Sequence, residues 1–522
     1  MTTSEPPSRW TFWIDRGGTF TDVIGARGGK VERTLKLLSV SDAYPDAAVE
    51  AMRRILGLKA HEIFPADRVE AIKMGTTVAT NALLERKGAR TLLIATQGFA
   101  DALIIGDQTR PDLFALDIVR PEPLAERTIE AVERLTATGE VLTPLDRELL
   151  ALQCREAVAA GLTSAAIAFL HADLNPVHEL AAAEIAKAAG FAHVAMSHEV
   201  SPLPRYLPRA ETTVADAYLT PALRAYVDQV ASAVNGADLY FMTSAGGLVR
   251  AQAFRGKDAV VSGPAGGVVG VAQTALQSSG GKAALGFDMG GTSTDVCRFD
   301  GILERRDRAE VAGVRLRAPM LDVETVAAGG GSILTFDGAR VRVGPGSAGA
   351  MPGPAAYGRG GPATVTDAQI VLGRLDPAHF PAVFGPDQNR PLDAPAARAR
   401  LQALADEMQA PSVQAAAEGF IAVCVEHTAQ AVRRISTERG FDPRDHSLVA
   451  FGGAAGQIAC WVAESLEITE VLSPRHASLL SAWGIGQAQL SSLKEQGLDA
   501  PLSDEGLSLA KARLDLLQTE AT

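Results

Sequence analysis

Two stretches in different halves of the chain, residues 14–23 and 287–296, share the pattern D-x-G-G-T-x-T-D-V. In each copy apolar residues lead into the aspartate and a strand-like run follows the glycines, which predicts a β-hairpin with a tight Gly-Gly turn. Glycines let backbone N–H groups approach an anion closely, and the aspartates, Asp15 and Asp288, could hold a metal ion or its water shell beside phosphate oxygens. Gly-Gly-Thr is also an ordinary turn. Because the pattern occurs twice, we favour duplicated lobes that each offer one phosphate-binding hairpin to a nucleotide between them.

The residues expected to contact the nucleotide are small or carry a hydroxyl group, and they lie in the turns of these hairpins. Threonine hydroxyls add hydrogen-bond donors to those of the backbone. The candidates are Gly17, Gly18, Thr19 and Thr21 in the first hairpin and Gly290, Gly291, Thr292 and Thr294 in the second.

Two further glycine-rich turns follow predicted strands. The strand at residues 324–328 runs into a triple-glycine loop of the phosphate-binding type, and the strand at residues 447–450 runs into a Phe-Gly-Gly turn. The second turn could receive the adenine and ribose of a nucleotide, or it could simply be a tight connection between a strand and a helix. The glycines concerned are Gly329, Gly330, Gly331, Gly452 and Gly453.

Two polar residues outside these turns are candidates for catalysis. Thr76 or Thr77 could cap a helix that runs to Arg86 and that Gly88 closes, and a helix N-terminus after a strand is also an anion site. Arg110 lies in a polar run without periodicity, which is typical of a loop, and is a candidate contact for an anionic group of the substrate.

The length of 522 residues predicts two or more domains, and strands alternating with helices predict an α/β fold. A helix beginning at residues 261–267 carries glycines that allow a ligand or another helix to approach closely. Prolines at 202, 204 and 208 mark a candidate boundary. We therefore expect an N-terminal domain with the first hairpin at residues 1–203, a second domain with the second hairpin at residues 204–492 and a tail at residues 493–522.

Composition argues against several classes of partner. The net charge is −12 and no block of lysine and arginine stands out, so neither nucleic acid nor an anionic membrane surface is expected as a partner. The four cysteines are far apart and form no C-x-x-C motif, which favours reduced thiols in the cytoplasm. The N-terminal residues lack an apolar signal core, and no apolar run is long enough to span a membrane.

With these motifs in view, the chain resembles the hydantoinase/5-oxoprolinase family, as a hydantoinase A-type subunit. That family belongs to the actin-like, sugar-kinase-like and Hsp70-like ATPase superfamily. The resemblance implies an α/β fold with duplicated actin-like (ribonuclease H-like) ATPase lobes around a nucleotide cleft. Residues 106–111 and 341–354 are most similar to 5-oxoprolinase. The stretches that carry the family resemblance are residues 15–23, 75–88, 261–267, 287–296, 326–332 and 451–456.

The resemblance also implies a reaction. Family members use ATP and Mg²⁺ to phosphorylate the carbonyl oxygen of a cyclic amide, here expected to be 5-oxo-L-proline. A hydantoinase B-type subunit or domain then completes ring opening, which yields L-glutamate. O-Phosphorylation makes the unreactive lactam more electrophilic and supplies a leaving group, so catalysis is mostly positioning and charge neutralisation. An oligomeric assembly is expected, and this chain alone is not expected to convert 5-oxoproline to glutamate.

The chain departs from the family pattern at several positions. Many relatives have His, Cys and His where this chain has Glu324, Ala356 and Ile458, and alanine and isoleucine cannot bind a metal ion. Relatives also tend to have a polar residue at Met351 and glycine at Ala455. The C-terminal segment is shorter than in full-length relatives, so we expect a truncated tail. Alternative functions are a hydantoin or N-methylhydantoin hydrolase, a carboxylase subunit of the acetone or acetophenone type, and a truncated or impaired nucleotide-binding subunit.

Overall fold

Two β-sheets of the same design form the centre of the molecule. The computed structural model describes residues 8–59, 61–107, 109–110, 113–278, 280–380, 382–387 and 389–521. In each sheet three antiparallel strands are followed by two parallel ones, which confirms the duplication expected from the repeated pattern. The first sheet runs β3 (Lys30–Leu38), β2 (Phe20–Arg27), β1 (Trp10–Arg16), β4 (Val69–Thr76) and β11 (Leu239–Met242), with β12 (Leu248–Arg250) added at its edge. The second runs β19 (Val323–Val326), β14 (Thr294–Phe299), β13 (Ala284–Met289), β22 (Ser447–Phe451) and β23 (Val471–Leu472).

Both predicted hairpins are present and have matching turns. Arg16 faces Thr21 across the first hairpin and Met289 faces Thr294 across the second. The Gly17 N–H donates to the carbonyl of Phe20 at 3.1 Å, and the Gly290 N–H donates to the carbonyl of Ser293 at 3.0 Å. The repeated sequence therefore forms the same turn twice, once at the tip of each sheet.

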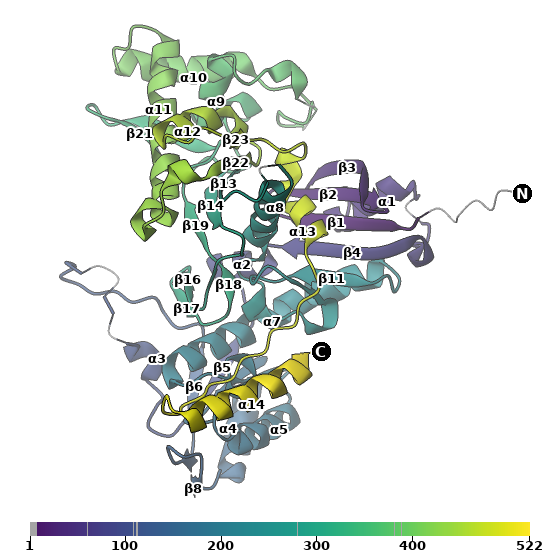
Figure 1. Cartoon of the computed structure of the whole chain (residues 1–522), viewed down its shortest axis with the longest axis vertical. Helices are drawn as coiled ribbons and strands as arrows, with labels where there is room; N and C mark the ends of the chain where they lie inside the picture. Colours follow the sequence, from purple (N-terminus) through teal and green to yellow (C-terminus); the bar gives the residue numbers. More distant parts are fainter. Residues whose placement is uncertain are drawn as a thin grey trace, which may run out of the picture.

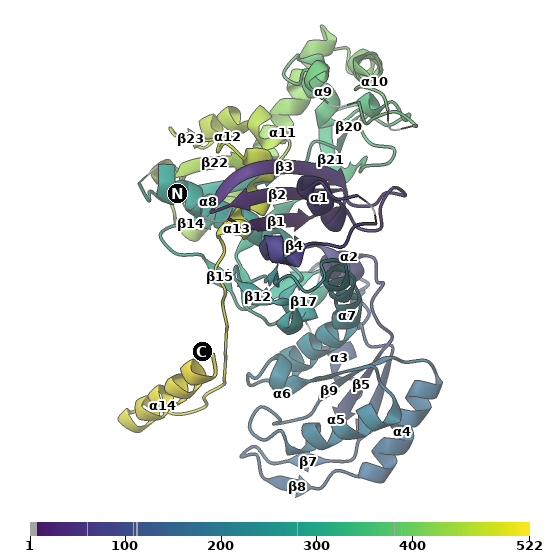
Figure 2. The same ribbon diagram turned by 90° about the vertical axis from the view of Figure 1, so that its right-hand side faces the viewer.

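Helices α8 (Ser262–Ser278) and α13 (Leu480–Gln487) cross between the two sheets (Figures 1 and 2). A Cβ atom added to Gly484 would lie 2.0 Å from the carbonyl oxygen of Gly266, and one added to Gly266 would lie 2.6 Å from the carbonyl oxygen of Ser481. The glycines of α8 thus admit another helix. The two lobes are joined by a helix crossing at which the backbones touch.

A third sheet is inserted between β4 and β11 and forms the lower part of Figure 1. Its four parallel strands are ordered β10 (His193–Met196), β9 (Ser164–Ala168), β5 (Thr91–Thr96) and β6 (Arg127–Ala131). Helices α4 (Arg147–Ala159) and α5 (Val177–Ala189) cover one face, and α7 (Tyr206–Ala233) covers the other. Helix α7 continues into the core of the first sheet. Because β11 and β12 come after α7 in the chain, the first sheet contains strands from both sides of the boundary expected at residue 203.

The remaining elements cover the second sheet or extend from it. Helices α11 (Val413–Ile435) and α12 (Ala459–Ser465) pack on its core, and β20 (Ser332–Phe336), β21 (Val341–Ser347), α9 (Val365–Val371) and α10 (Ala394–Glu407) extend it upwards in Figure 1. Helix α14 (Asp504–Ala521) has no buried residue and stands apart in Figure 2. No helix among the described residues is long and apolar enough to cross a membrane. The short paired strands are β7 (Arg134–Leu135) with β8 (Val141–Thr143), β15 (Arg305–Arg306) with β18 (Met320–Leu321), and β16 (Ala309–Val311) with β17 (Val314–Leu316).

The helix crossing generates a first prediction. Gly484→Ala should lower the free energy of unfolding by about 3 kcal/mol or more, because the new methyl group can only fit if the two helices move apart. Gly419→Ala is the matched control, since a Cβ at Gly419 in α11 meets open space, and it should be neutral or stabilise by up to about 1 kcal/mol. Chemical denaturation of the two variants measures the difference. Equal stability would contradict the close crossing.

Candidate active site between the two hairpins

Each hairpin presents a pair of aspartates on one face of its sheet. Asp15 lies directly opposite Asp22 in the first hairpin, and Asp288 lies directly opposite Asp295 in the second. Directly opposed residues of antiparallel strands project from the same face. All four side chains are only partly buried. The duplicated fold therefore places two pairs of carboxylates where a ligand can reach them.

One turn of α13 lies against Asp288 and against Gly75, the strand neighbour of Asp15. The Ser481 hydroxyl donates to Asp288 Oδ2 at 3.5 Å. A Cβ on Gly75, the partner of Asp15 on β4, would lie 2.8 Å from Ile485 Cδ1 and 3.5 Å from Asp15 Oδ1. Ser481 and Ile485 are four residues apart and share one helix face. The two hairpins therefore approach the same stretch of helix from either side.

The electrostatics of the aspartates show the same convergence. The pKa of Asp15 is raised to about 7, mainly by burial and also by the negative charge of Asp22, against the opposing effect of Lys36. The pKa of Asp288 is raised to about 8, mainly by burial and then by the charges of Asp295, Asp15 and Asp22, while the hydrogen bond from Ser481 opposes the shift. Since charges of the first hairpin act on Asp288, the two hairpins face a common space.

These carboxylates fit a magnesium ion that is shared with a phosphate ligand. Asp15 Oδ1 is buried and has no hydrogen-bond partner among the described residues, so it has a free lone pair for a cation or a water molecule. No group of three or more His, Cys, Asp or Glu side chains in the described part of the chain forms a ready metal cage. That arrangement suits Mg²⁺, which commonly uses one or two carboxylates together with waters and substrate phosphates.

Two of the threonine hydroxyls in the hairpins form hydrogen bonds within the protein, and two threonines are exposed. The Thr21 hydroxyl is buried and bonds to the Ser39 hydroxyl at 3.0 Å, and Ser39 in turn donates to the Gly17 carbonyl at 2.7 Å. In the second hairpin the buried Thr294 hydroxyl donates to the carbonyl of Ala328. These two threonines hold the hairpins in place. Thr19 and Thr292, together with Gly18 and Gly291, are exposed at the tips.

The triple-glycine loop is hydrogen-bonded to the turn of the second hairpin. The Gly330 N–H donates to the Gly290 carbonyl at 2.9 Å and the Gly331 N–H donates to the Gly291 carbonyl at 2.6 Å. The Gly329 N–H donates to the Ser332 hydroxyl at 2.9 Å, and a Cβ on Gly329 would lie 2.8 Å from Gly291. All three N–H groups are thus used inside the protein. Direct contact of this loop with a nucleotide stays a prediction.

The Phe-Gly-Gly turn after β22 packs on the second aspartate. Gly452 has a φ of +87°, and a Cβ there would lie 2.1 Å from Asp288 Oδ1. The Ala454 N–H donates to the carbonyl of Met289 at 2.9 Å, which fixes the turn to the end of β13. A Cβ on Gly453 would meet open space. The turn therefore combines one glycine that the fold requires with one that a ligand could approach.

Thr76 ends β4 beside the first hairpin and is buried. Its hydroxyl accepts from the Val78 N–H at 3.3 Å, and its carbonyl accepts from the Ser262 hydroxyl at 2.8 Å. Thr77 precedes α2 (Val78–Leu84), but its hydroxyl donates to the Arg16 carbonyl at 3.3 Å and makes no capping bond to the helix. Thr76 therefore ties the end of β4, beside the first hairpin, to α8, and its catalytic role stays a prediction.

Two details of the region after Thr76 differ from the sequence-based expectation. Helix α2 ends at Leu84 rather than at Arg86. Gly88 does not close the helix, because it lies against the ring of Tyr218, where a Cβ would be 2.2 Å from a ring carbon. This glycine is required by a long-range contact that local sequence does not reveal.

Arg110 lies in the loop that follows α3 (Ala102–Ile105) in the inserted domain, and its side chain is exposed. Nearby, Asp107 forms an ion pair with Arg315, which lowers the pKa of Asp107 to about 2. Two neighbours within the motif, Gln108 and Pro111, lie outside the described residues. The expected contact between Arg110 and a substrate stays a prediction.

Positions at which the chain departs from the family pattern have ordinary structural surroundings. Glu324 forms an ion pair with Arg434 at 3.5 Å. Ala356 and Ile458 are buried among apolar side chains.

Several residues of the site were not selected from the sequence. Asp22 and Asp295 are the second aspartates of the repeated pattern. Each lies on the far side of the predicted turn from the first aspartate, so pairing of the two strands of a hairpin could have placed them opposite Asp15 and Asp288. Ser481 and Ile485 carry no local signal, since only the packing of α13 brings them to the hairpins. Lys36 also becomes visible only through strand pairing.

Comparisons with known proteins agree with this architecture. The family models described as Hydantoinase/oxoprolinase and Hydantoinase/oxoprolinase N-terminal region match residues 209–494 and 11–190. The 5-oxoprolinase of Saccharomyces cerevisiae is 43% identical over 90% of this chain and 40% of its own length, and 5-oxoprolinase 1 of Arabidopsis thaliana is 41% identical over 98% of this chain and 44% of its own length. The chain thus spans less than half the length of these relatives.

Shorter relatives and solved structures extend the comparison. Caprolactamase subunit alpha of Pseudomonas jessenii is 34% identical over 90% of this chain and 69% of its own length. The structure of ATP-dependent caprolactamase from the same organism gives a TM-score of 0.81 at 31% identity, covering 98% of this chain and 76% of that one. Acetone carboxylase shares the fold, with a TM-score of 0.78 at 24% identity over 99% of this chain and 76% of that one. These matches show that the chain belongs to the hydantoinase/oxoprolinase family.

Proposed function

We propose that this chain is the ATP-using part of a cyclic-amide hydrolase and that its substrate is 5-oxo-L-proline. The observation that carries the proposal is the convergence of the two hairpins, with Asp15 and Asp288 on either side of one turn of α13. The names of the similar proteins, 5-oxoprolinase and ATP-dependent caprolactamase, support a cyclic amide as substrate.

The proposed first step is transfer of the γ-phosphoryl group of ATP to the lactam. The carbonyl oxygen attacks the γ-phosphorus, the bond between that phosphorus and the bridging oxygen breaks, and ADP leaves. The exposed hairpin tips bind phosphate oxygens through backbone N–H groups and the hydroxyls of Thr19 and Thr292. Bound Mg²⁺, held directly or through water by Asp15 and Asp288, would neutralise phosphate charge. Catalysis here is positioning and charge neutralisation.

The second step is proposed to need another polypeptide or domain of the hydantoinase B type. Water adds to the activated carbon and the C–N bond opens, with the ring nitrogen leaving as the amine, to give an acyl phosphate; a second water then hydrolyses the acyl phosphate to phosphate and glutamate. The name of the relative from Pseudomonas jessenii, a subunit alpha, supports a partner subunit. We also propose that the assembly is oligomeric and cytoplasmic, in keeping with four cysteines that form no disulfide.

Asp15→Asn tests the proposed function directly. The variant should fold, because asparagine has the same shape, and its ATP turnover with 5-oxoproline should fall on the order of 100-fold or more, as expected when a charged group at a phosphoryl-transfer site is lost. ADP and glutamate are measured separately, with and without a B-type partner. The unaltered chain should cleave ATP, and the partner should couple cleavage to glutamate. Equal turnover by the variant and the unaltered chain would contradict the role of Asp15.

Gly291→Val tests whether a phosphate approaches the second hairpin tip. A Cβ on Gly291 meets no atom within 4 Å, so the fold should tolerate valine, while the side chain would stand where the ligand must lie. Calorimetry should show Mg·ADP binding at least tenfold weaker, with an unchanged melting temperature. Gly419→Val, at an open position in α11, is the control and should bind like the unaltered chain. Unchanged affinity of Gly291→Val would place the nucleotide elsewhere.

The raised pKa values predict how stability depends on pH without metal or nucleotide. Since the pKa values of Asp15 and Asp288 are about 7 and about 8 in the folded chain, against 3.8 for an ordinary aspartate, the folded chain holds protons that the unfolded chain has lost. The contribution of these groups is therefore full at low pH and is lost as pH rises through 7 and 8. Denaturation midpoints between pH 5 and 9 should fall more steeply in the unaltered chain than in Asp288→Asn. Parallel curves for the two proteins would contradict the shift.

A further inference from the structure

In each lobe, the strand next to the hairpin adds one more residue to the row of opposed aspartates. The identity of this added residue differs between the two lobes. On β3, Lys36 lies directly opposite Asp22, which lies opposite Asp15. On β19, Thr325 occupies the corresponding place opposite Asp295. The same row of the duplicated sheet therefore reads Lys-Asp-Asp in the first lobe and Thr-Asp-Asp in the second.

Both residues bind the outer aspartate of their row, Lys36 as a cation and Thr325 through a neutral hydroxyl. The Lys36 ammonium forms an ion pair with Asp22 Oδ1, and the Lys36 side chain is 43% exposed, with Nζ 5.4 Å from the centre of the Phe20 ring at the hairpin tip. The Thr325 hydroxyl donates to Asp295 Oδ1 at 2.6 Å. A neutral donor is thus sufficient to bind the outer aspartate, so the fold itself does not require a cation at this position.

Arg16, which is also close to Asp15, does not offset the negative charge of the aspartates as Lys36 does. Arg16, the neighbour of Asp15, is directed to Asp46 at 3.6 Å and to the ring of Tyr226 at 4.7 Å. The corresponding neighbour of Asp288 is Met289. The charges that shift the pKa of Asp15 or Asp288 come, among the described residues, from three aspartates and one cation: Asp15, Asp22, Asp295 and Lys36.

We propose that Lys36 is a positioning residue that makes the first hairpin the favoured half of the cleft for the terminal phosphate, by balancing the charge of Asp22 beside Asp15. A nucleotide phosphate that approaches four carboxylates is repelled, and a cation in the first row reduces this repulsion on one side. Such an imbalance orients the phosphate chain between two otherwise matching hairpins. The inference rests on the proposed use of ATP.

The test replaces Lys36 by the residue of the other lobe. Lys36→Thr should keep the melting temperature, since Thr325 shows that threonine can bind the aspartate, and should weaken Mg·ADP binding in calorimetry about tenfold or more, with a matching fall in kcat for ATP. Lys36→Arg should keep most of the affinity. Lys30→Thr is the control, because Lys30 is exposed at the far end of the same strand, opposite Arg27. Should Lys36→Thr fail to fold, Lys36→Gln, which also donates to Asp22, takes its place.

A charge swap separates position from net charge. The double variant Lys36→Thr with Thr325→Lys has the charge of the unaltered chain but carries it on the second hairpin. Affinity and kcat should remain low. If the swap restored affinity and kcat, the inference would be wrong, and the same holds if Lys36→Thr bound Mg·ADP as tightly as the unaltered chain. Neither outcome would contradict the proposed function. An unaltered chain that binds no Mg·ADP would overturn both.

Discussion

The close crossing of α8 and α13 is the constraint on which the other features of the molecule depend. Gly266 and Gly484 bring the two helix backbones into contact, and no side chain fits between them. The two sheets pack on either side of this crossing, so the separation of the lobes is set by backbone contact rather than by adjustable side chains. On the same helix, Ser481 then reaches Asp288 and Ile485 reaches Gly75, the strand neighbour of Asp15.

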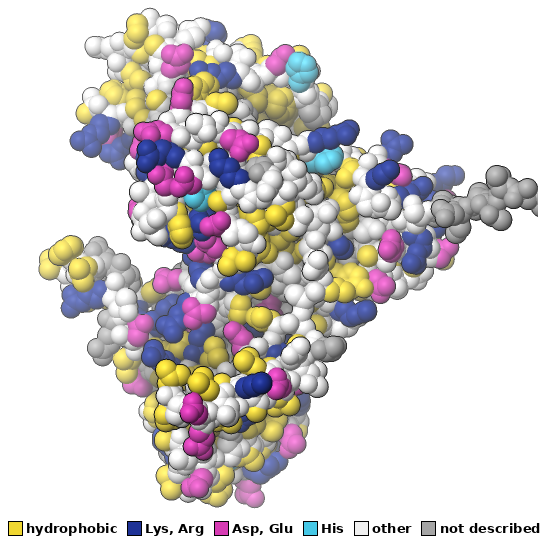
Figure 3. All heavy atoms as spheres, in the orientation of Figure 1, with side chains coloured by type: hydrophobic (Ala, Val, Ile, Leu, Met, Phe, Trp, Pro, Cys, Tyr) yellow, Lys and Arg dark blue, Asp and Glu magenta, His cyan; other side chains and the backbone are white. Residues whose placement is uncertain are grey.

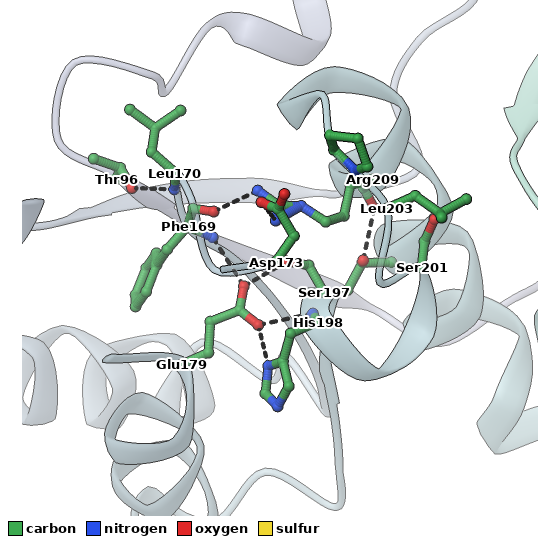
Figure 4. A network of polar contacts seen from close by, with 12 residues as sticks. Thr96, Phe169, Leu170, Asp173, Glu179, Ser197, His198, Ser201, Leu203 and Arg209 are labelled. Carbon is green, nitrogen blue, oxygen red and sulfur yellow. Dashed lines mark hydrogen bonds and ion pairs between the residues drawn. The ribbon is translucent and has the colours of Figure 1, made fainter. Parts of the chain in front are cut away.

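That geometry concentrates negative charge. Four partly buried aspartates face one space, and burial together with mutual repulsion raises the pKa of Asp15 and Asp288 into the neutral range. A divalent cation and a polyphosphate would convert this unfavourable arrangement into a binding site, because the cation compensates both sets of anions. The inserted sheet, by contrast, pairs its buried charges internally. Figure 4 shows Glu179 accepting hydrogen bonds from Ser197 and His198, and Arg209 paired with Asp173.

Glycine has three separate uses around the site. At Gly452 and Gly484 it makes room for a neighbouring group of the protein itself. In the triple-glycine loop it brings N–H groups to the carbonyls of the second hairpin, and at Gly291 and Gly453 it leaves open space. On the face shown in Figure 3, basic and acidic side chains are scattered among each other without forming a continuous basic surface, which agrees with the absence of a basic block in the sequence.

The repeated pattern is enough to predict two hairpins, two lobes and the leading aspartates, because turn geometry and strand alternation are local properties of the chain. The family follows from the same motifs. The partners of those motifs are decided by tertiary packing: Lys36 beside Asp22, the triple-glycine loop behind the second hairpin, and α13 between the lobes. These contacts join residues far apart in the chain, and nothing in the local sequence distinguishes a glycine that meets a phosphate from one that meets a helix. Long-range contact alone decides which glycines and charges form the site.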